Sequence, residues 1–329
     1  MRHLCSAALA LVLAACPALA ETLKISSYLP PKHTFTEAVA AWGQAVSEAT
    51  GGAVAFEVYP AGQLGPVNRQ FDLVASGAAD AAIILHSATP GRFPLTEIAG
   101  LPMTYPSGGD ASAVSSRRLT ELAPEYLAGE HPGVHILWMA VTPPLKMSFA
   151  HTDPATLDKL RGQRIRYAGA VFQQVLDSLG AAPLPVPPGE VSEALAKGII
   201  DGALFPFEAT MAFDLGPELD YAMEPGVASA TFAFVMNQRV YDGLPAEVRA
   251  AIDAQSGAAR AEAFGAAWDK SEAAGRSYLT DQHKVTIVTL PEAEQARLRD
   301  SVAPIIAGSV EAAAQRGAPA QAFYDAYTK

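Results

Sequence analysis

Three arginines, Arg161, Arg164 and Arg166, fall within six residues of an otherwise acidic chain. A guanidinium group is planar and binds a carboxylate through two parallel hydrogen bonds, so it suits the recognition of a small organic anion. Arginines are also common on solvated surfaces, where they pair with Asp or Glu. The residue types alone therefore leave two alternatives open, an anion-binding site or a group of surface charges.

Side chains that can donate hydrogen bonds lie at the ends of two expected strands. Tyr28 and His33 lie at and after the end of the strand expected at 22–28, and His86 and Ser87 directly follow an apolar strand at 79–85. Hydroxyl, phenol and imidazole groups in such places can bind a carboxylate or hydroxyl of a ligand. A single histidine is more often structural, and that alternative stays open for His33 and His86.

The sequence contains no G-x-S-x-G, P-loop, G-x-G-x-x-G or H-E-x-x-H motif. His131 and His135 have the spacing of two zinc ligands, but Pro132 and Gly133 between them disfavour a helix and no third ligand is near. We therefore expect no catalytic residue, metal ion or cofactor. A hydrolytic enzyme is the remote alternative.

The order of the expected elements indicates an α/β fold. Strands at 22–28, 53–59 and 79–85 alternate with helices at 36–49 and 68–76, which predicts a parallel sheet. Further strands are expected at 133–141, 146–150, 164–167, 202–205, 227–235 and 284–290, and further helices at 171–179, 191–197, 246–277 and 292–316.

The chain is long enough for two α/β lobes with their own cores, and it has no low-complexity linker or internal repeat. One lobe is expected to comprise 21–145 and about 236–275, and the other 146–235 and about 276–329. The hinged cleft between them would hold the ligand. Phe232, in the returning strand, would line either this cleft or the core.

Residues 1–20 have the features of a secretory signal peptide, with an apolar stretch and small residues before Glu21. Cleavage is expected after Ala20, and the alternative is lipoprotein processing at Cys16. Cys5 and Cys16 are the only cysteines, so the mature chain would form no disulfide.

The net charge of −11 argues against nucleic-acid binding. No apolar run after residue 20 is long enough to cross a bilayer. These features predict a soluble exported protein, which we expect to be a monomer.

Several motifs occur together in one order. They are LPPKH at 29–33, TGG at 50–52, VYPAGQLG at 58–65, LRGQRIR at 160–166, EV at 190–191 and KGIIDG at 197–202. Over essentially the whole mature length the chain resembles the solute-binding proteins of tripartite ATP-independent periplasmic (TRAP) transporters. A binding protein of an ATP-driven importer is the nearest alternative.

The resemblance implies a periplasmic binding protein type II-like fold whose two lobes close on a small organic acid. It also implies delivery of this ligand to the small and large TRAP membrane subunits. Arg166 matches the binding arginine of the family, which is expected to pair with the ligand carboxylate.

The sequence departs from the family pattern at two places. Phe205 stands where many members have Asn. Many members also carry a second arginine directly after the strand that corresponds to 138–142, whereas the stretch 142–146 of this chain contains none. A second ligand carboxylate would lack a partner beside Glu208, which costs several kcal/mol when buried. Contact with Phe205 and Phe207 would instead stabilise the binding of a ligand with an apolar body, by about 25 cal/mol per Å² of apolar surface buried.

We therefore favour a monocarboxylate with an aromatic or apolar body. A C4-dicarboxylate or 2-oxoacid is the alternative ligand. The alternative for Phe205 and Phe207 is that their rings fill the core of the lobe. Glu208 would accept a hydrogen bond from either a ligand hydroxyl or a protein donor.

Overall fold

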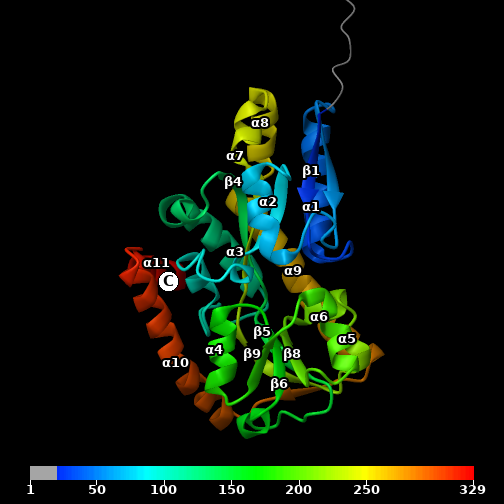
Figure 1. Ribbon diagram of the computed structural model, residues 1–329, viewed down its shortest axis with the longest axis vertical. Helices are drawn as coiled ribbons and strands as arrows, with labels where there is room; N and C mark the ends of the chain where they lie inside the picture. The colour runs from blue at the N-terminus through cyan, green and yellow to red at the C-terminus, as the bar shows by residue number, and fades with distance from the viewer. Residues whose placement is uncertain (1–20) are drawn as a thin grey trace, which may run out of the picture.

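The computed structural model describes residues 21–329, so the expected signal peptide and Cys16 lie outside the described residues. Two mixed sheets form the two lobes that the sequence predicts (Figure 1). The first lobe has the order β2-β1-β3-β10-β4, with β1 (Glu21–Ser26), β2 (Val54–Tyr59), β3 (Ala81–Leu85), β4 (Val134–Val141) and β10 (Thr231–Asn237). The second lobe has the order β11-β9-β5-β8-β6-β7, with β5 (Leu145–Phe149), β6 (Arg164–Tyr167), β7 (Ala182–Pro185), β8 (Gly202–Phe205), β9 (Tyr221–Ala228) and β11 (Thr286–Thr289).

Helices cover both sheets and join the lobes. The helices of the first lobe are α1 (Thr34–Ala49), α2 (Gln70–Ser76), α3 (Ala111–Leu122), α7 (Gln238–Gly243) and α8 (Ala246–Ala254). The helices of the second lobe are α4 (Ala170–Ser178), α5 (Val191–Ala196) and α6 (Phe207–Ala212). The remaining helices are α9 (Gly257–Ser277), α10 (Glu292–Gln315) and α11 (Ala320–Thr328). Helix α10 packs on α4, and α11 packs on α3, so the C-terminal segment runs along both lobes (Figure 1).

Two short segments carry the chain between the sheets. The strand predicted at 227–235 is in fact two strands, because β9 ends at Ala228 and β10 begins at Thr231 in the other sheet. The chain thus returns to the first sheet at Thr231, earlier than the change expected near residue 236. The backbone N–H of Thr142 donates to the Ala230 carbonyl at 3.0 Å, and the Ala230 N–H donates to the Thr142 hydroxyl at 2.9 Å. The two crossings therefore lie side by side.

The long helix predicted at 246–277 is broken into α8 and α9. Gly257 has φ +80, a left-handed conformation that glycine adopts without strain, and it turns the chain between the two helices. The predicted helix at 292–316 is confirmed as α10, whereas α3, α6, α7 and α11 lie outside the ranges predicted to be helical.

Helix α9 packs closely on one helix of each lobe. A Cβ on Gly265 would lie 2.5 Å from the Cα of Ala113 at the start of α3. A Cβ on Gly275 would lie 2.3 Å from the carbonyl oxygen of Phe207 at the start of α6. Both glycines therefore allow backbones to approach where no side chain fits.

Carboxylates of α9 also cap these two helices. Asp269 accepts hydrogen bonds from the N–H groups of Ser112 and Ala113 at 3.0 Å, and Glu272 accepts one from the N–H of Glu208 at 2.8 Å. Negative groups at helix N-termini satisfy unpaired N–H groups and interact favourably with the helix dipole. Helix α9 is thus the common support of both lobes.

We predict that Gly265→Ala and Gly275→Ala each lower the free energy of unfolding by about 1–3 kcal/mol, because the added methyl group overlaps backbone atoms. Urea unfolding followed by circular dichroism measures this loss. The control is Gly308→Ala on the exposed side of α10, where no atom lies within 4 Å of the added Cβ. This change should stabilise the protein by up to about 1 kcal/mol through helix propensity, and equal effects at all three positions would contradict the packing argument.

Candidate ligand-binding site

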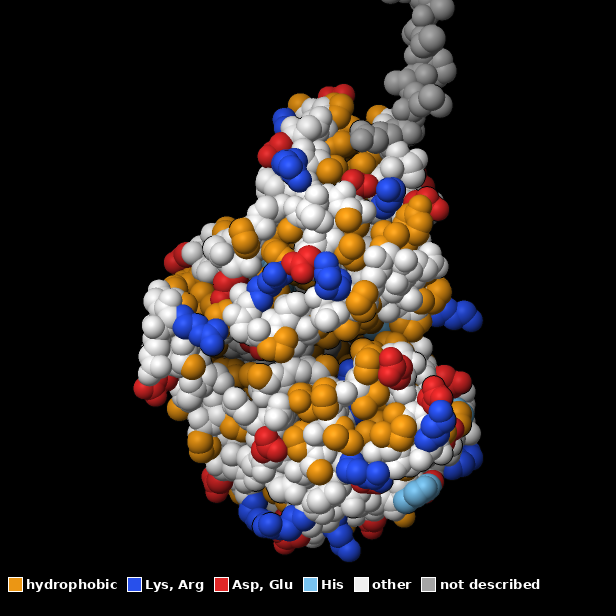
Figure 2. All heavy atoms as spheres, viewed as in Figure 1, with side chains coloured by type: hydrophobic (Ala, Val, Ile, Leu, Met, Phe, Trp, Pro, Cys, Tyr) orange, Lys and Arg blue, Asp and Glu red, His pale blue; other side chains and the backbone are white. Residues whose placement is uncertain are grey.

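A cavity lies between the lobes, at the two crossing segments. Most of its lining is apolar, and it is contributed by both lobes and by α9. An open groove adjoins the cavity, and Tyr28, Ser87 and Arg166 line both spaces. Figure 2 shows this side of the molecule hollowed between the lobes, with hydrophobic side chains along the edges. The location and lining are typical of a site for a small organic ligand.

Arg166, near the C-terminal end of β6, is only 2% exposed. Its Nε donates to the carbonyl of Val186 at 3.0 Å, and its Nη1 donates to the carbonyl of Leu204 at 3.3 Å. No carboxylate of residues 21–329 lies within ion-pair distance of it. Burial lowers the pKa of Arg166 to about 9. A buried cation with only neutral partners is costly, and a bound anion would offset that cost.

The two neighbouring arginines have conventional partners. Arg164 binds Asp201, with its Nε 2.9 Å from Oδ2, and its side chain is about half exposed. Arg161 is exposed and lies 3.7 Å from Asp158. Of the two alternatives that the sequence leaves open, these two arginines follow the surface-charge one, and Arg166 alone reaches the cavity.

Aromatic rings form much of the cavity wall. Phe205 lies under the guanidinium of Arg166, with 4.0 Å from Cζ to the ring centroid, which is a cation–π contact. Phe232 also lines the cavity and packs edge-on against Trp268.

Phe207 does not line the cavity. Its ring is buried in the core of the second lobe, 4.9 Å from Nζ of Lys146. This placement corrects the expectation that Phe207 contacts the ligand. The reason is that Phe207 begins α6, so it turns away from the direction in which Phe205 points at the end of β8.

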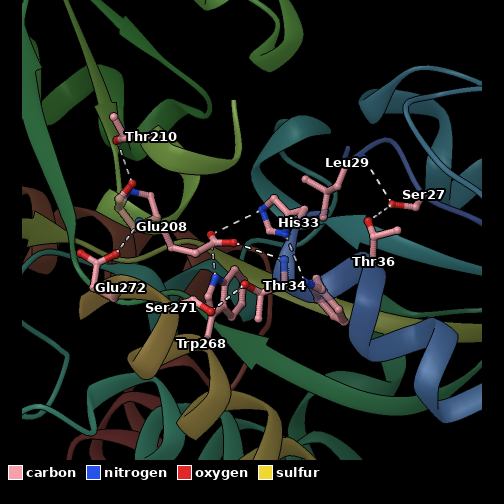
Figure 3. A network of polar contacts seen from close by, with 12 residues as sticks. Ser27, Leu29, His33, Thr34, Thr36, Glu208, Thr210, Trp268, Ser271 and Glu272 are labelled. Carbon is pink, nitrogen blue, oxygen red and sulfur yellow. Dashed lines mark hydrogen bonds and ion pairs between the residues drawn. The ribbon is translucent and has the colours of Figure 1, made fainter. Parts of the chain in front are cut away.

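Glu208 lines the cavity, but protein donors occupy its carboxylate. Trp268 Nε1 donates to Oε2 at 2.9 Å, and the backbone N–H of Thr34 donates to Oε1 at 3.3 Å (Figure 3). These contacts join α6 to α9 and to the first lobe. Of the two roles that the sequence leaves open for Glu208, the structure shows acceptance from protein donors.

His33 lies between Glu208 and the start of α1. Its Nδ1 accepts the N–H of Phe35 at 3.2 Å and so caps α1. Burial lowers the pKa of His33, although Glu208 acts in the opposite direction. The neutral ring therefore carries its proton on Nε2, which faces Oε2 of Glu208 at 3.6 Å (Figure 3). His33 lines the cavity through this arrangement.

His86 lies inside the first lobe and does not line the cavity. His131 Nδ1 donates to the Leu127 carbonyl at 2.8 Å, which leaves its Nε2 as an acceptor. His86 Nε2 donates to that atom at 3.1 Å, and His86 Nδ1 accepts from the Thr231 hydroxyl at 3.1 Å. Both ring nitrogens are thus used, which corrects the expectation that His86 binds the ligand.

Tyr28 and Ser87 do line the cavity. Burial raises the pKa of Tyr28, whereas Arg166 acts to lower it. The Ser87 hydroxyl is buried and has no hydrogen-bond partner. The chain turns at His86–Ala88, so His86 and Ser87 point to different places although they are adjacent. Tyr28 and Ser87 each bring a hydroxyl group that can donate a hydrogen bond to the cavity that Arg166 also lines.

Several cavity residues were missed in the sequence analysis. They are Leu29, Leu85, Thr142, Leu145, Ala168, Phe172, Pro188, Leu204, Pro206, Ala209, Phe213, Ala230 and Trp268. Trp268 comes from the middle of α9, about 60 residues beyond Glu208 in the chain, and only the fold brings them together. Among these residues, Thr142 could have been predicted from the sequence, because it is a polar residue directly after a buried strand. The same signal pointed to Ser87.

A sequence profile described as "Bacterial extracellular solute-binding protein, family 7" matches residues 25–313. The chain belongs to this family. It is 28% identical over 269 residues to the outer membrane transporter protein TsaT of Comamonas testosteroni, covering 79% of this chain and 78% of that protein. It is 26% identical over 270 residues to the C4-dicarboxylate-binding periplasmic protein DctP of Rhodobacter capsulatus, covering 78% of each.

Solved structures of TRAP solute-binding proteins have the same fold. The protein from Rhodoferax ferrireducens, in complex with benzoate, is 27% identical with a TM-score of 0.88, covering 93% of this chain and 96% of that one. The protein from Bordetella bronchiseptica, with bound mandelate, is 29% identical with a TM-score of 0.85, covering 93% and 97%. The prediction of a TRAP solute-binding protein is confirmed, and the protein is a receptor and not an enzyme.

Residues 21–329 contain neither a candidate metal site nor a candidate membrane span. No group of three or more His, Cys, Asp or Glu side chains in this part of the chain is arranged to hold a metal ion. None of its helices is both long and apolar enough to span a bilayer.

We predict that the buried histidines of this solute-binding protein make its stability depend on pH. An unfolded histidine takes up a proton near pH 6.5, whereas burial keeps the pKa of His131 at about 4 in the folded protein. The unfolded state then binds more protons, so this part of the unfolding free energy is lost as the pH falls below about 6.5. His131 alone contributes a loss of about 2 kcal/mol between pH 7 and pH 5.

Urea unfolding at several pH values tests this contribution. The His131→Gln variant should lose less stability than the wild type over the same pH range. His151→Gln is the control, because Asp220 raises the pKa of that exposed ring and its removal cannot flatten the pH dependence. An equally steep loss in His131→Gln and the wild type would contradict the prediction.

Proposed function

We propose that this protein captures a monocarboxylate with an aromatic or apolar body for a TRAP transporter. The observation that carries the proposal is the buried guanidinium of Arg166, which lies over the ring of Phe205 without an anionic partner among residues 21–329. A ligand carboxylate would supply the missing charge through charge-assisted hydrogen bonds. Tyr28 and Ser87 would add donors on the side of the first lobe.

The charges around the cavity favour a single carboxylate. Arg166 is the only Lys or Arg among its lining residues. Nearby Lys146 is paired with Glu272, so it is not available to a second ligand carboxylate. Such a group would also face Glu208, which is 1% exposed. The remaining wall, with Phe172, Phe205 and Phe232, suits an aromatic body.

Similar proteins support the same ligand class. The proteins of known structure from Rhodoferax ferrireducens and Bordetella bronchiseptica hold benzoate and mandelate, which are both aromatic monocarboxylates. The Rhodobacter capsulatus relative, in contrast, is named for C4-dicarboxylates. The apolar wall around Phe205 supports our proposal that the present chain binds an aromatic monocarboxylate.

The proposed route starts with export to the periplasm and cleavage after Ala20, or lipid attachment at Cys16. The lobes then close on the acid, and the closed surface is recognised by the small and large membrane subunits. The described structure has the lobes in contact, since Ser87 of the first lobe touches Gly169 of the second.

Aromatic monocarboxylates such as benzoate and mandelate should raise the Tm, because a ligand that binds only the folded state at 100 times its Kd adds about 2.7 kcal/mol of stability. Thermal-shift measurements would compare these acids with succinate and pyruvate. Arg166→Ala should abolish the shift. Arg164→Ala removes an arginine two residues away that pairs with Asp201 and should keep it. A shift with succinate alone would overturn the ligand class, and an unchanged shift in Arg166→Ala would remove this residue from the site.

We predict that Gly169→Ala prevents full closure and weakens binding at least about tenfold, a loss of about 1.4 kcal/mol. Its Cβ would lie 2.5 Å from the Cβ of Ser87 across the lobe boundary. Gly169 also has a positive φ, so the matched control is Gly162→Ala, which has φ +72 and no atom within 4 Å of the new Cβ. Calorimetric titration with benzoate should separate the two variants. If Gly169→Ala binds benzoate as tightly as Gly162→Ala does, the contact with Ser87 does not limit closure and the prediction is wrong.

A further inference from the structure

A second, smaller cavity adjoins the ligand cavity. We call it the polar annex, and its lining residues are Ser87, Glu97, Gly100, Val171, Phe172, Ser229, Ala230 and Thr231. Ser87, Phe172 and Ala230 line both the annex and the ligand cavity. The two spaces therefore adjoin at these three residues.

Three buried polar atoms of the annex have no hydrogen-bond partner. They are the hydroxyl oxygens of Ser87 and Ser229 and Oε1 of Glu97. Ser229 is 1% exposed and Ser87 is 6% exposed. An unsatisfied buried polar group costs about 1–3 kcal/mol, and such groups are rare in folded proteins. Three of them around one small space indicate that something polar belongs there.

The backbone around the annex is closely fitted. The N–H of Ser229 donates to the carbonyl of Gly100 at 3.1 Å, and a Cβ on Gly100 would lie 2.3 Å from the carbonyl oxygen of Ser229. The backbone N–H of Ser229 thus has a partner, whereas its buried hydroxyl has none. The neighbouring Thr231 hydroxyl is used by His86.

Glu97 is kept apart from the usual partners of a carboxylate. The adjacent Glu130 takes the N–H groups of Leu95 and Thr96 and the Thr96 hydroxyl, at 2.7–2.9 Å. Burial raises the pKa of Glu97 to about 7, Glu130 adds to this effect, and Arg316 opposes it. Oε1 of Glu97 is therefore a buried hydrogen-bond acceptor that lacks a donor, on a residue that lines the annex.

We propose that the polar annex binds a hydroxyl substituent of the ligand, so that the protein prefers hydroxylated aromatic monocarboxylates to their unsubstituted parents. A hydroxyl group donates one hydrogen bond and accepts others, which matches a carboxylate acceptor beside two serine hydroxyls. This inference rests on the proposed function, because Arg166 must hold the carboxylate for the substituent to reach the annex.

The annex is completed by closure. Val171 and Phe172 come from α4 of the second lobe, whereas Glu97, Gly100 and Thr231 belong to the first. A hydroxyl group in the annex therefore contacts residues of both lobes only when they are together. Recognition of the substituent adds to the stability of the closed form.

Calorimetric titration can test the preference with matched ligands. The pairs are benzoate with 2-, 3- and 4-hydroxybenzoate, and phenylacetate with mandelate. At least one hydroxylated acid should bind the wild type about tenfold more tightly than its parent, as expected for one well-placed hydrogen bond. Ser229→Ala and Glu97→Leu should reduce this ratio towards one. Both should bind the parent acid within about twofold of the wild type, which also shows that they are folded.

Ser148→Ala is the matched control. The Ser148 hydroxyl is also buried without a partner but lines neither cavity, so its removal should leave the ratio unchanged. Equal affinities of parent and hydroxylated acids for the wild type would overturn the inference and indicate that water fills the annex. A preference that survives in Ser229→Ala and Glu97→Leu would also overturn it. If no aromatic acid binds the wild type, the proposed function fails, and the annex inference fails with it.

Discussion

A guanidinium group loses its hydration when it is buried, and a protein that buries one must replace the lost interactions. Arg166 receives only part of this replacement, from two backbone carbonyls and the face of Phe205. The remaining deficit is the driving force for anion binding in our proposal, because a carboxylate removes it when it arrives. The surrounding structure has to keep internal carboxylates from neutralising this charge first.

Helix α9 and its partners meet that requirement. The carboxylates that join α6 to α9 are already engaged, since Glu208 accepts from Trp268 and Thr34, and Glu272 pairs with Lys146 and caps α6. These bonds hold the carboxylates in place away from Arg166. The same contacts attach α9 to both lobes, so the electrostatics of the site and the cohesion of the lobes depend on one set of residues.

The α/β class, the two lobes and most strands could be predicted from periodicity, and Arg166 from its motif. The local sequence does not show that Arg166 is buried at the cavity whereas Arg164 is exposed and paired. This difference depends on which side chains of the second lobe cover each end of β6. His86 and Ser87 show the same limit, since a single tight turn sends one into the core and the other into the cavity. Trp268 reaches the site only through the path of α9, which no local pattern reports.

The position of β10 affects how this chain can be divided. This strand pairs with β3 on one side and β4 on the other, yet in the sequence it follows strands β5 to β9 of the second lobe. A fragment ending at residue 141 would have unpaired strand edges in the middle of its sheet, and exposed edges promote aggregation. The two lobes are therefore not independent modules that one cut could separate, and in a nascent chain β3 and β4 lack their shared neighbour β10 until residue 237 has emerged.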